Sequence, residues 1–517
     1  MEDYHSSWLL LAVSVVMSTI LAKLWLLKRL KTEKVTLPPG PQGLPIVGYL
    51  PYLGANLHQT FMELAQVHGP IYKLSIGQKL CVIISSPSLI KEVVKDQDST
   101  FANRNPNIAA LAFSFGGNDI AFAPYGPQWR LLRKIFVREM LSHANLNTIC
   151  TVVMRNEIEK CIGDVYSKLG QPIDIGELAF LTVINSIASM FWGGTLKGEE
   201  ATRIGAEFRR AVLQLVVMLG KPNISDFFPP LARFDLQGIK RDINKAMVQI
   251  DKIFDFVIGQ GRKSGPLNVD DHHQNENGGK DFLQVLLEFK DQDSGRSIST
   301  SEIKAMLMDI VIGGTDTTST MVEWTMTELM QHPNVLRKSQ EEIKNVVGSV
   351  DKLVEDHQLN KLTYLQAVVK ESLRLHPVAP LLLPRCPTKS CTVGGYTIPK
   401  GTKVFLNVWA VHRDPEFWDN PCEFRPERFL GSEEALKLDY TGNNNNFKYL
   451  PFGGGRRICA GLPLGERMLM NVLASLLHCF HWKLPDGHAK LDCEEKLGVV
   501  LEKSTPLVAV PVLPTDP

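Results

Sequence analysis

The chain has 517 residues, of which 44% are hydrophobic and 21% are charged, so it can build a large core and lacks the composition of a disordered protein. Its 56 basic and 55 acidic residues leave a net charge of +1, without the basic excess that is typical of nucleic-acid-binding proteins. The nine cysteines include no CxxC pair, which disfavours a zinc ribbon or a disulfide framework.

The first predicted element is an apolar run over residues 8–27, interrupted only by Lys23. Twenty helical residues at ~1.5 Å each span a hydrocarbon layer of ~30 Å. Acidic residues precede the run and basic residues follow it, which predicts that the rest of the chain lies in the cytosol. A cleaved signal peptide is the alternative, but the run is long for one and no cleavage site is evident. We therefore expect a retained membrane anchor over residues 1–30.

Residues 31–51 are basic and rich in proline, which predicts a stiff, extended hinge. We expect the remainder, residues 52–517, to form a single domain. Helical periodicity is found at 129–141, 153–168, 201–219, 239–262, 302–331, 335–348, 362–376 and 463–480, and β-type runs at 71–75, 80–84, 392–398, 403–406 and 507–512. This pattern predicts a mainly α fold with small β-sheets (α+β). The polar stretch 263–281 is typical of a flexible surface loop.

Trp129 and Arg133 are four residues apart on a predicted helix and therefore share one face. An indole N–H and a guanidinium on one face can both bind an anion. A surface cation over an aromatic ring is the alternative. The same helix carries a basic stripe, Arg130, Lys134 and Arg138, which is either a solvated face or a surface that attracts an acidic protein.

Gly313 and Gly314, followed by Thr315, Asp316 and Thr317, lie in the middle of the longest predicted helix. Each glycine costs roughly 1 kcal/mol there relative to alanine, so some other interaction must require it. A close helix crossing is one explanation. The other is that a ligand approaches the helix, where a threonine hydroxyl that bonds back to a carbonyl opens a local bulge.

Glu371 and Arg374 are three residues apart on a predicted helix and can form an ion pair. Taken alone, such a pair is usually exposed and contributes little to stability.

The most specific motif is PFGGGRRICAG, residues 451–461, which ends where the last long helical pattern begins. Cys459 is thereby placed near a helix amino terminus, where the dipole and free amides favour a thiolate. An inert buried cysteine is the alternative. A phosphate-binding loop is disfavoured because no Lys-Ser or Lys-Thr follows the glycines.

This motif resembles the Phe-x-x-Gly-x-Arg-x-Cys-x-Gly signature of cytochrome P-450, the family of haem-thiolate monooxygenases, and it matches at Phe452, Gly455, Arg457, Cys459 and Gly461. The resemblance extends over nearly the whole chain. It implies a haem b cofactor (iron protoporphyrin IX) with Cys459 as the axial ligand of its iron.

The resemblance also implies roles for the other candidates. The cofactor-binding residues would be Phe452 together with Trp129, Arg133, Arg385 and Arg457 at the haem propionates. Asp316 and Thr317 match the oxygen-activation motif, and would be catalytic as a proton relay. Glu371 and Arg374, with Arg428 of Pro-Glu-Arg-Phe, would form a buried structural network. Substrate-lining positions would be Phe113, Phe115, Ile310, Gly313, Val378, Leu382 and Val499.

Segments such as 309–323 and 449–461 resemble the plant microsomal enzymes, close to a branch that holds sesquiterpene and flavone hydroxylases. The resemblance implies hydroxylation of a small lipophilic plant metabolite, a sesquiterpenoid or a flavonoid, with O2. No dinucleotide fingerprint occurs in the chain, so electrons from NADPH would arrive through a reductase. The implied location is the endoplasmic reticulum membrane, as a single-pass protein with a cytosolic catalytic domain.

Two other functions remain open at this stage. One is a non-oxygenating haem-thiolate isomerase or dehydratase, which the Thr317 motif disfavours because such chemistry needs no proton relay. The other is a haem-binding protein without catalytic activity, which the relay and the apolar lining residues also disfavour.

Overall fold

The computed structural model describes Ser18 and residues 36–514, with gaps at 193–197, 264–281, 293–294, 350–351, 443–444 and 486–490. The predicted anchor, residues 1–30, lies outside the described residues except for Ser18. The predicted surface loop, 263–281, likewise lies outside them except for Lys263.

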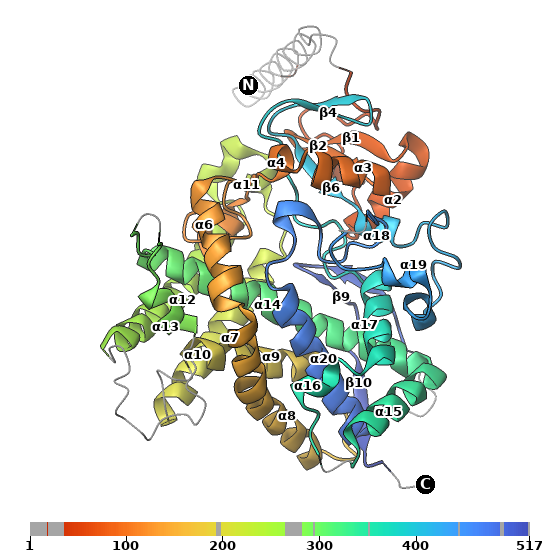
Figure 1. Cartoon of the computed structure of the whole chain (residues 1–517). Helices are drawn as coiled ribbons and strands as arrows, with labels where there is room; N and C mark the ends of the chain where they lie inside the picture. Colours follow the sequence, from red (N-terminus) through yellow and green to blue (C-terminus); the bar gives the residue numbers. More distant parts are fainter. Residues whose placement is uncertain are drawn as a thin grey trace, which may run out of the picture.

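Helices make up most of the described chain (Figure 1). The longer helices are α2 (Leu57–His68), α6 (Pro127–Ile135), α8 (Arg155–Ser167), α9 (Ile175–Trp192), α10 (Gly198–Leu219), α12 (Ile239–Lys263), α14 (Thr300–Gln331), α15 (Pro333–Val347), α17 (Thr363–Leu375) and α20 (Leu462–Cys479). The shorter ones are α3 (Pro87–Lys91), α4 (Asp98–Phe101), α5 (Ile108–Phe113), α7 (His143–Thr148), α11 (Ile224–Phe227), α13 (Phe282–Glu288), α16 (Asp356–Leu359), α18 (Val408–Val411) and α19 (Glu433–Leu436). Single 3-10 turns are η1 (Leu50–Tyr52), η5 (Pro229–Phe234), η6 (Pro426–Phe429) and η7 (Gly455–Arg457), and π-helical turns are η2 (Glu92–Asp96), η3 (Phe136–Met140) and η4 (Ile149–Met154).

The strands form small, separate sheets. In the first, β1 (Ile71–Ile76) pairs antiparallel with β2 (Lys79–Ile84), which pairs parallel with β6 (Lys403–Leu406). In the second, β10 (Val508–Val512) lies between β3 (Ile173–Asp174) and β7 (His481–Lys483). The others are the hairpins β4 (Cys391–Val393) to β5 (Tyr396–Ile398) and β8 (Glu495–Leu497) to β9 (Leu501–Lys503). The predicted mainly α fold with small sheets is confirmed.

The central element is α14, whose start is set by a capping box in which Ser299 and Glu302 bond each other's backbone N–H. It packs along α9 and also contacts α20, in the middle of the helical part (Figure 1). Apolar residues of α9, α10, α12 and α14 form one buried cluster, and those of α8, α15, α17 and α20 form a second.

The sequence pattern did not predict α9, because this helix is apolar on nearly every side and shows no helical periodicity. Among the described residues it is also the helix that is long and apolar enough to cross a membrane, but 67% of that span is buried inside the protein. It is therefore a core helix, as expected for an element that is buried all round.

The described part of the predicted hinge, residues 36–51, packs against the first sheet. The Lys73 N–H donates to Pro39 O at 2.8 Å, and the Tyr49 N–H donates to Ser75 O at 2.7 Å. A Cβ on Gly40 would lie 1.9 Å from Lys73 O, so the two backbones are in direct contact. From Thr36 onward this segment therefore lies against the folded body, and the role of residues 31–51 as a stiff hinge stays a prediction.

Candidate functional site

The loop before α20 is folded tightly around Cys459. The Cys459 N–H donates to Phe452 O at 3.0 Å, and Gly453 and Gly455 have φ values of 73° and 63°. A Cβ on Gly455 would lie 2.1 Å from Val94 O, so the loop is pressed against η2 and α4. This turn directs the chain into α20, which begins at Leu462.

The side chain of Cys459 is exposed to solvent. The surrounding atoms nevertheless reduce its hydration, and this loss raises the pKa of its thiol. Backbone N–H groups of Gly461 and Leu462 and the charge of Arg133 act in the opposite direction. The amides at the start of α20 thus favour a thiolate, as expected, but loss of hydration has the larger effect on the pKa of this thiol. An additional cation bound to the sulfur would stabilise the thiolate.

The two glycines of α14 have different surroundings. A Cβ on Gly314 would lie 3.1 Å from Ile187 Cδ1, so this glycine allows the close crossing with α9. A Cβ on Gly313 would have no atom within 4 Å, and Gly313 is exposed in the middle of a mostly buried helix. The close crossing therefore explains Gly314, whereas the open space at Gly313 leaves room for a ligand, whose approach stays a prediction.

Thr317 lies one turn after Gly313 on the same face of α14, and its hydroxyl donates to Gly313 O at 2.6 Å. The expected back-bond is thus present, but α14 continues as regular α-helix from Thr300 to Gln331, and the expected bulge is absent from it. Beside Thr317, burial and the nearby Glu502 raise the pKa of Asp316 to about 6. The start of α20 is close by, because a Cβ on Gly465 would lie 4.0 Å from Thr318 Oγ1.

The cationic candidates gather around the indole of Trp129. The guanidinium carbons of Arg457 and Arg133 lie 4.3 and 5.7 Å from its ring centroid. Arg133 donates to Ile458 O at 2.7 Å, next to Cys459. Arg385 donates to Gly454 O at 2.5 Å and pairs with Asp98 at 3.3 Å. The structure therefore brings all four residues to the Cys459 loop.

Arg104 is a further member of this cluster that sequence reasoning missed. It is 8% exposed and donates to the carbonyls of Leu383 and Pro384, immediately before Arg385. Burial and the charges of Arg457 and Arg385 lower its pKa well below the usual value. A single arginine outside any motif carries no spacing signal in the sequence, so it was not a candidate.

The cluster has an excess of buried positive charge. Burial and the charge of Arg385 lower the pKa of Arg457 to about 9, with a further contribution from Arg133. An anionic group placed here would relieve that repulsion. A thiol next to a cationic cluster, across from an open glycine on α14, fits haem b, which presents an iron and two propionates.

The predicted structural network is present behind this loop. Arg374 binds Glu371 through two hydrogen bonds of 2.7 and 2.9 Å, and Arg428 binds the same carboxylate at 3.1 Å. Arg374 also donates to the carbonyls of His412, Pro421 and Glu423. Glu371 and Arg374 have no exposed side-chain surface, so this pair is not the common surface pair.

The predicted substrate-lining residues fall into different surroundings. Phe113, Phe115 and Ile310 belong to the apolar cluster around α14. Val378 is 8% exposed and packs in the second cluster, whereas Leu382 packs toward Gly453 of the cysteine loop. Val499 is 38% exposed and lies next to Gly220, just after α10. Phe113, Phe115 and Ile310 thus share one apolar cluster, and a substrate-lining role for the whole set stays a prediction.

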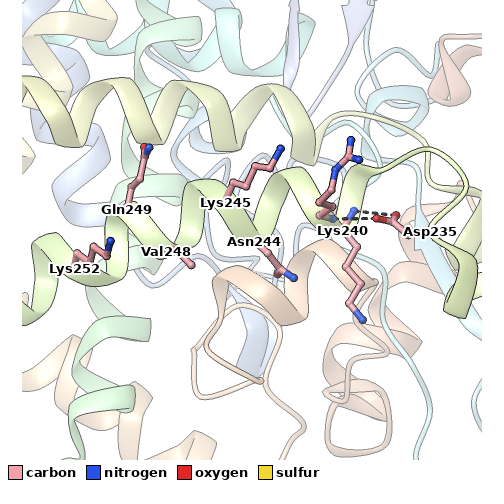
Figure 2. Close-up of a pocket in the computed structure, with 8 residues that line it drawn as sticks. Asp235, Lys240, Asn244, Lys245, Val248, Gln249 and Lys252 are labelled. Carbon is pink, nitrogen blue, oxygen red and sulfur yellow. Dashed lines mark hydrogen bonds between the residues drawn. The ribbon is translucent and has the colours of Figure 1, made fainter.

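A separate surface hollow of about 700 Å³ lies along α12, after Asp235 (Figure 2). Lys240, Lys245 and Lys252 extend from this helix, and Asp235 accepts hydrogen bonds from the first backbone N–H groups of α12. None of the candidate residues above lines it.

Fold and site together define a mainly helical haem protein whose cysteine loop leads into α20, a helix that packs against the glycine-containing α14. The comparisons with known proteins agree: the cytochrome P-450 family model matches residues 38–510. The chain therefore belongs to the cytochrome P-450 family. It is an oxidoreductase, a haem b monooxygenase.

Its relatives include a flavonoid 3',5'-hydroxylase of Crocosmia x crocosmiiflora, 38% identical over 93% of this chain and 92% of the relative. A flavonoid 3'-monooxygenase of Petunia hybrida is also 38% identical, over 93% of each chain. A zebrafish cytochrome P-450 structure with progesterone has a TM-score of 0.75 at 25% identity, and the match covers 88% of this chain and 99% of that one.

Proposed function

We propose that this protein hydroxylates a flavonoid with one atom of O2. The observation that carries the proposal is the similarity to flavonoid hydroxylases over more than nine-tenths of the chain. The apolar residues Phe113, Phe115 and Ile310 beside α14 suit a flat aromatic substrate. A sesquiterpenoid substrate stays a prediction from the sequence, and these relatives favour the flavonoid.

In this proposal the chain holds haem b through Cys459 and the arginine cluster. The sulfur of Cys459 would be the iron ligand, and Arg133, Arg385, Arg457 and the Trp129 indole would be the partners of the propionates. When bound, haem b supplies the redox chemistry that activates O2. Phe452 restrains the loop by accepting the Cys459 N–H.

Asp316 and Thr317 would deliver protons to the reaction. With a pKa of about 6, Asp316 exchanges protons with water near neutral pH. The Thr317 hydroxyl donates its hydrogen to Gly313 O. The hydroxyl oxygen of Thr317 can therefore accept a hydrogen bond from a donor beside Gly313. In this proposal Asp316 supplies the proton, and Thr317 orients the group that receives it.

The electron donor would be an NADPH-dependent reductase that docks on α6 and η3. Arg130, Lys134 and Arg138 are exposed there, on the helix that carries Arg133. Such a basic face attracts an acidic partner. The anchor at residues 1–30 and the endoplasmic reticulum location belong to the same proposal.

The test is turnover by the full-length holoenzyme with a reductase and NADPH under ¹⁸O2. A flavonoid, such as a flavanone with an unsubstituted ring, is expected to gain one labelled oxygen. The proposal is contradicted if flavonoids give no product while a sesquiterpene hydrocarbon is hydroxylated, or if the product carries no label.

Two cysteine variants test the ligand assignment in the same assay. Cys459→Ser is expected to abolish turnover and the thiolate-type carbonyl spectrum of the reduced protein. Cys422→Ser, at an exposed cysteine outside the site, is the matched control and should keep both. Retention of the carbonyl spectrum in Cys459→Ser would refute the assignment.

A further inference from the structure

Two carboxyl groups lie near the arginine cluster, on either side of the Ile120 N–H, and neither was a candidate in the sequence analysis. Asp119 lies between α5 and α6 and is completely buried. Asp309 lies on α14, one turn before Gly313, and is partly buried. The Oδ1 atom of each is buried and has no hydrogen-bond partner among the described residues. Two unsatisfied carboxylate oxygens in one buried region are costly and require an explanation.

Their other oxygens hold the backbone of the loop that precedes α6. Asp309 Oδ2 accepts the Ile120 N–H at 2.6 Å, and Asp119 Oδ2 accepts the Phe122 N–H at 2.9 Å. The carbonyl of Ile120 in turn accepts from Trp129 Nε1 at 2.9 Å and from Arg457 Nη1 at 2.7 Å. Asp309 is thus linked through one peptide unit to both donors.

We propose that Asp119 and Asp309 share a single proton, and that the resulting acid pair positions Arg457 and Trp129 for the haem propionates. One proton between the two groups would satisfy both free Oδ1 atoms at once. It would also leave the pair with a single negative charge. The inference rests on the proposed haem site and extends it to two residues that no motif contains.

The electrostatics support the shared proton. Burial raises the pKa of Asp119 to about 6, and burial together with the charge of Asp119 raises the pKa of Asp309 well above its usual value. The charged groups that face the pair are Arg457, which interacts with both carboxyls, and Arg104, which interacts with Asp119. Their positive charges stabilise one ionised carboxylate, but a second negative charge would repel the first.

The decisive comparison is between Asp309→Asn and Asp309→Leu in the full-length holoenzyme. An asparagine reproduces the protonated acid, because its oxygen can accept the Ile120 N–H while its amide donates to Asp119. A leucine can do neither and leaves a buried N–H unsatisfied. The measurement is the rate at which haem transfers to an excess of a haem-scavenging apoglobin, across a range of pH.

We expect Asp309→Leu to release haem roughly tenfold faster than the wild type at neutral pH, because it loses a buried hydrogen bond. Asp309→Asn should match the wild type at neutral pH. As the pH is raised, release should accelerate in the wild type, whose pair loses its proton, and stay constant in Asp309→Asn. Asp164→Leu, at an exposed aspartate of α8, is the control for the substitution itself.

Thermal unfolding against pH gives a second readout that does not depend on haem transfer. An acid whose folded pKa is raised keeps a proton that the unfolded chain loses, so wild-type stability should fall as the pH rises above about 4. This dependence should flatten in Asp309→Asn and also in Asp119→Asn. The proposal is overturned if Asp309→Asn behaves as Asp309→Leu does, or if it keeps the wild-type pH dependence. Neither measurement uses a flavonoid, so both results can be interpreted even if the protein does not hydroxylate flavonoids.

Discussion

Gly455 is a residue at which two separate constraints exclude a side chain. Its φ of 63° is a left-handed conformation, and a Cβ there would meet Val94 O at 2.1 Å and Asp98 Oδ1 at 2.7 Å. Asp98 also accepts hydrogen bonds from Arg385 and Arg456, so a shift of this loop moves part of the arginine cluster. The glycine therefore connects backbone geometry to the haem site.

We predict that Gly455→Ala destabilises the protein by more than the roughly 1–2 kcal/mol of left-handed alanine alone, because the carbonyl of Val94 must also move. Haem content after purification should fall together with the free energy of unfolding in urea. Gly401→Ala is the matched control, since Gly401 has a φ of 82° but no atom within 4 Å of its Cβ position. Equal losses in the two variants would refute the steric contribution.

At the level of single residues, the sequence analysis found residues that belong to motifs and missed those that do not. Cys459, Arg457 and Thr317 stand in motifs that resemble those of a known family, and this resemblance implied their roles. Arg104, Asp119 and Asp309 come from different segments and act only because folding brings them together. No spacing in the sequence connects them, so the structure was needed to find them.

Among the elements, α17 is joined to η6 by the ion pair of Glu371 with Arg428, and to the segment before η6 by hydrogen bonds of Arg374. Arg374 has no exposed side-chain surface and uses all three guanidinium nitrogens, two of them for Glu371. Arg428 provides a third hydrogen bond to the same carboxylate. Loss of one partner would leave buried charge without full compensation.

We predict that Arg374→Ala lowers the free energy of unfolding by about 3–5 kcal/mol, the usual cost of breaking a buried pair. Unfolding in a chemical denaturant measures this change in the free energy of unfolding. Arg425→Ala is the control, because Arg425 contacts Glu371 through its backbone N–H and its side chain pairs with Asp419 at the surface. If Arg374→Ala lowers the free energy of unfolding by less than about 1 kcal/mol, the prediction is wrong, because an exposed ion pair contributes that much.

Periodicity predicted α8, α10, α12, α14, α15, α17 and α20 to within a few residues, although α14 is buried along most of its length. It also predicted the β4–β5 hairpin, whose turn at Gly394 and Gly395 has φ values of 55° and 79°. It failed for α9, which lacks a polar face. It also missed α2, of which only His58 and Phe61 are buried, so burial accounts for only part of what the sequence left unpredicted.

Across the whole molecule, the packing of distant segments depended on contacts that no local pattern contains. The β8–β9 hairpin was not predicted, yet Glu495 at its start joins elements from both ends of the chain. Its carboxylate lies 3.1 Å from His58 of α2, 3.4 Å from His376 after α17, and 3.4 Å from Arg413 after α18. Nothing in the spacing of these residues predicts that they meet.

This junction predicts the behaviour of the protein in acid. Burial alone would raise the pKa of Glu495, but hydrogen bonds from His376 and His58 and the charge of Arg413 hold it well below its usual range. Because the folded pKa is depressed, the stabilisation is fully present above the unfolded pKa, about 4.3, and is lost as the pH falls toward the folded value. Glu495→Gln should therefore lower the melting temperature at neutral pH and reduce its fall below about pH 4. Glu494→Gln, at the exposed neighbouring glutamate, should leave both unchanged, and an acid transition that is identical in the wild type and Glu495→Gln would refute this role.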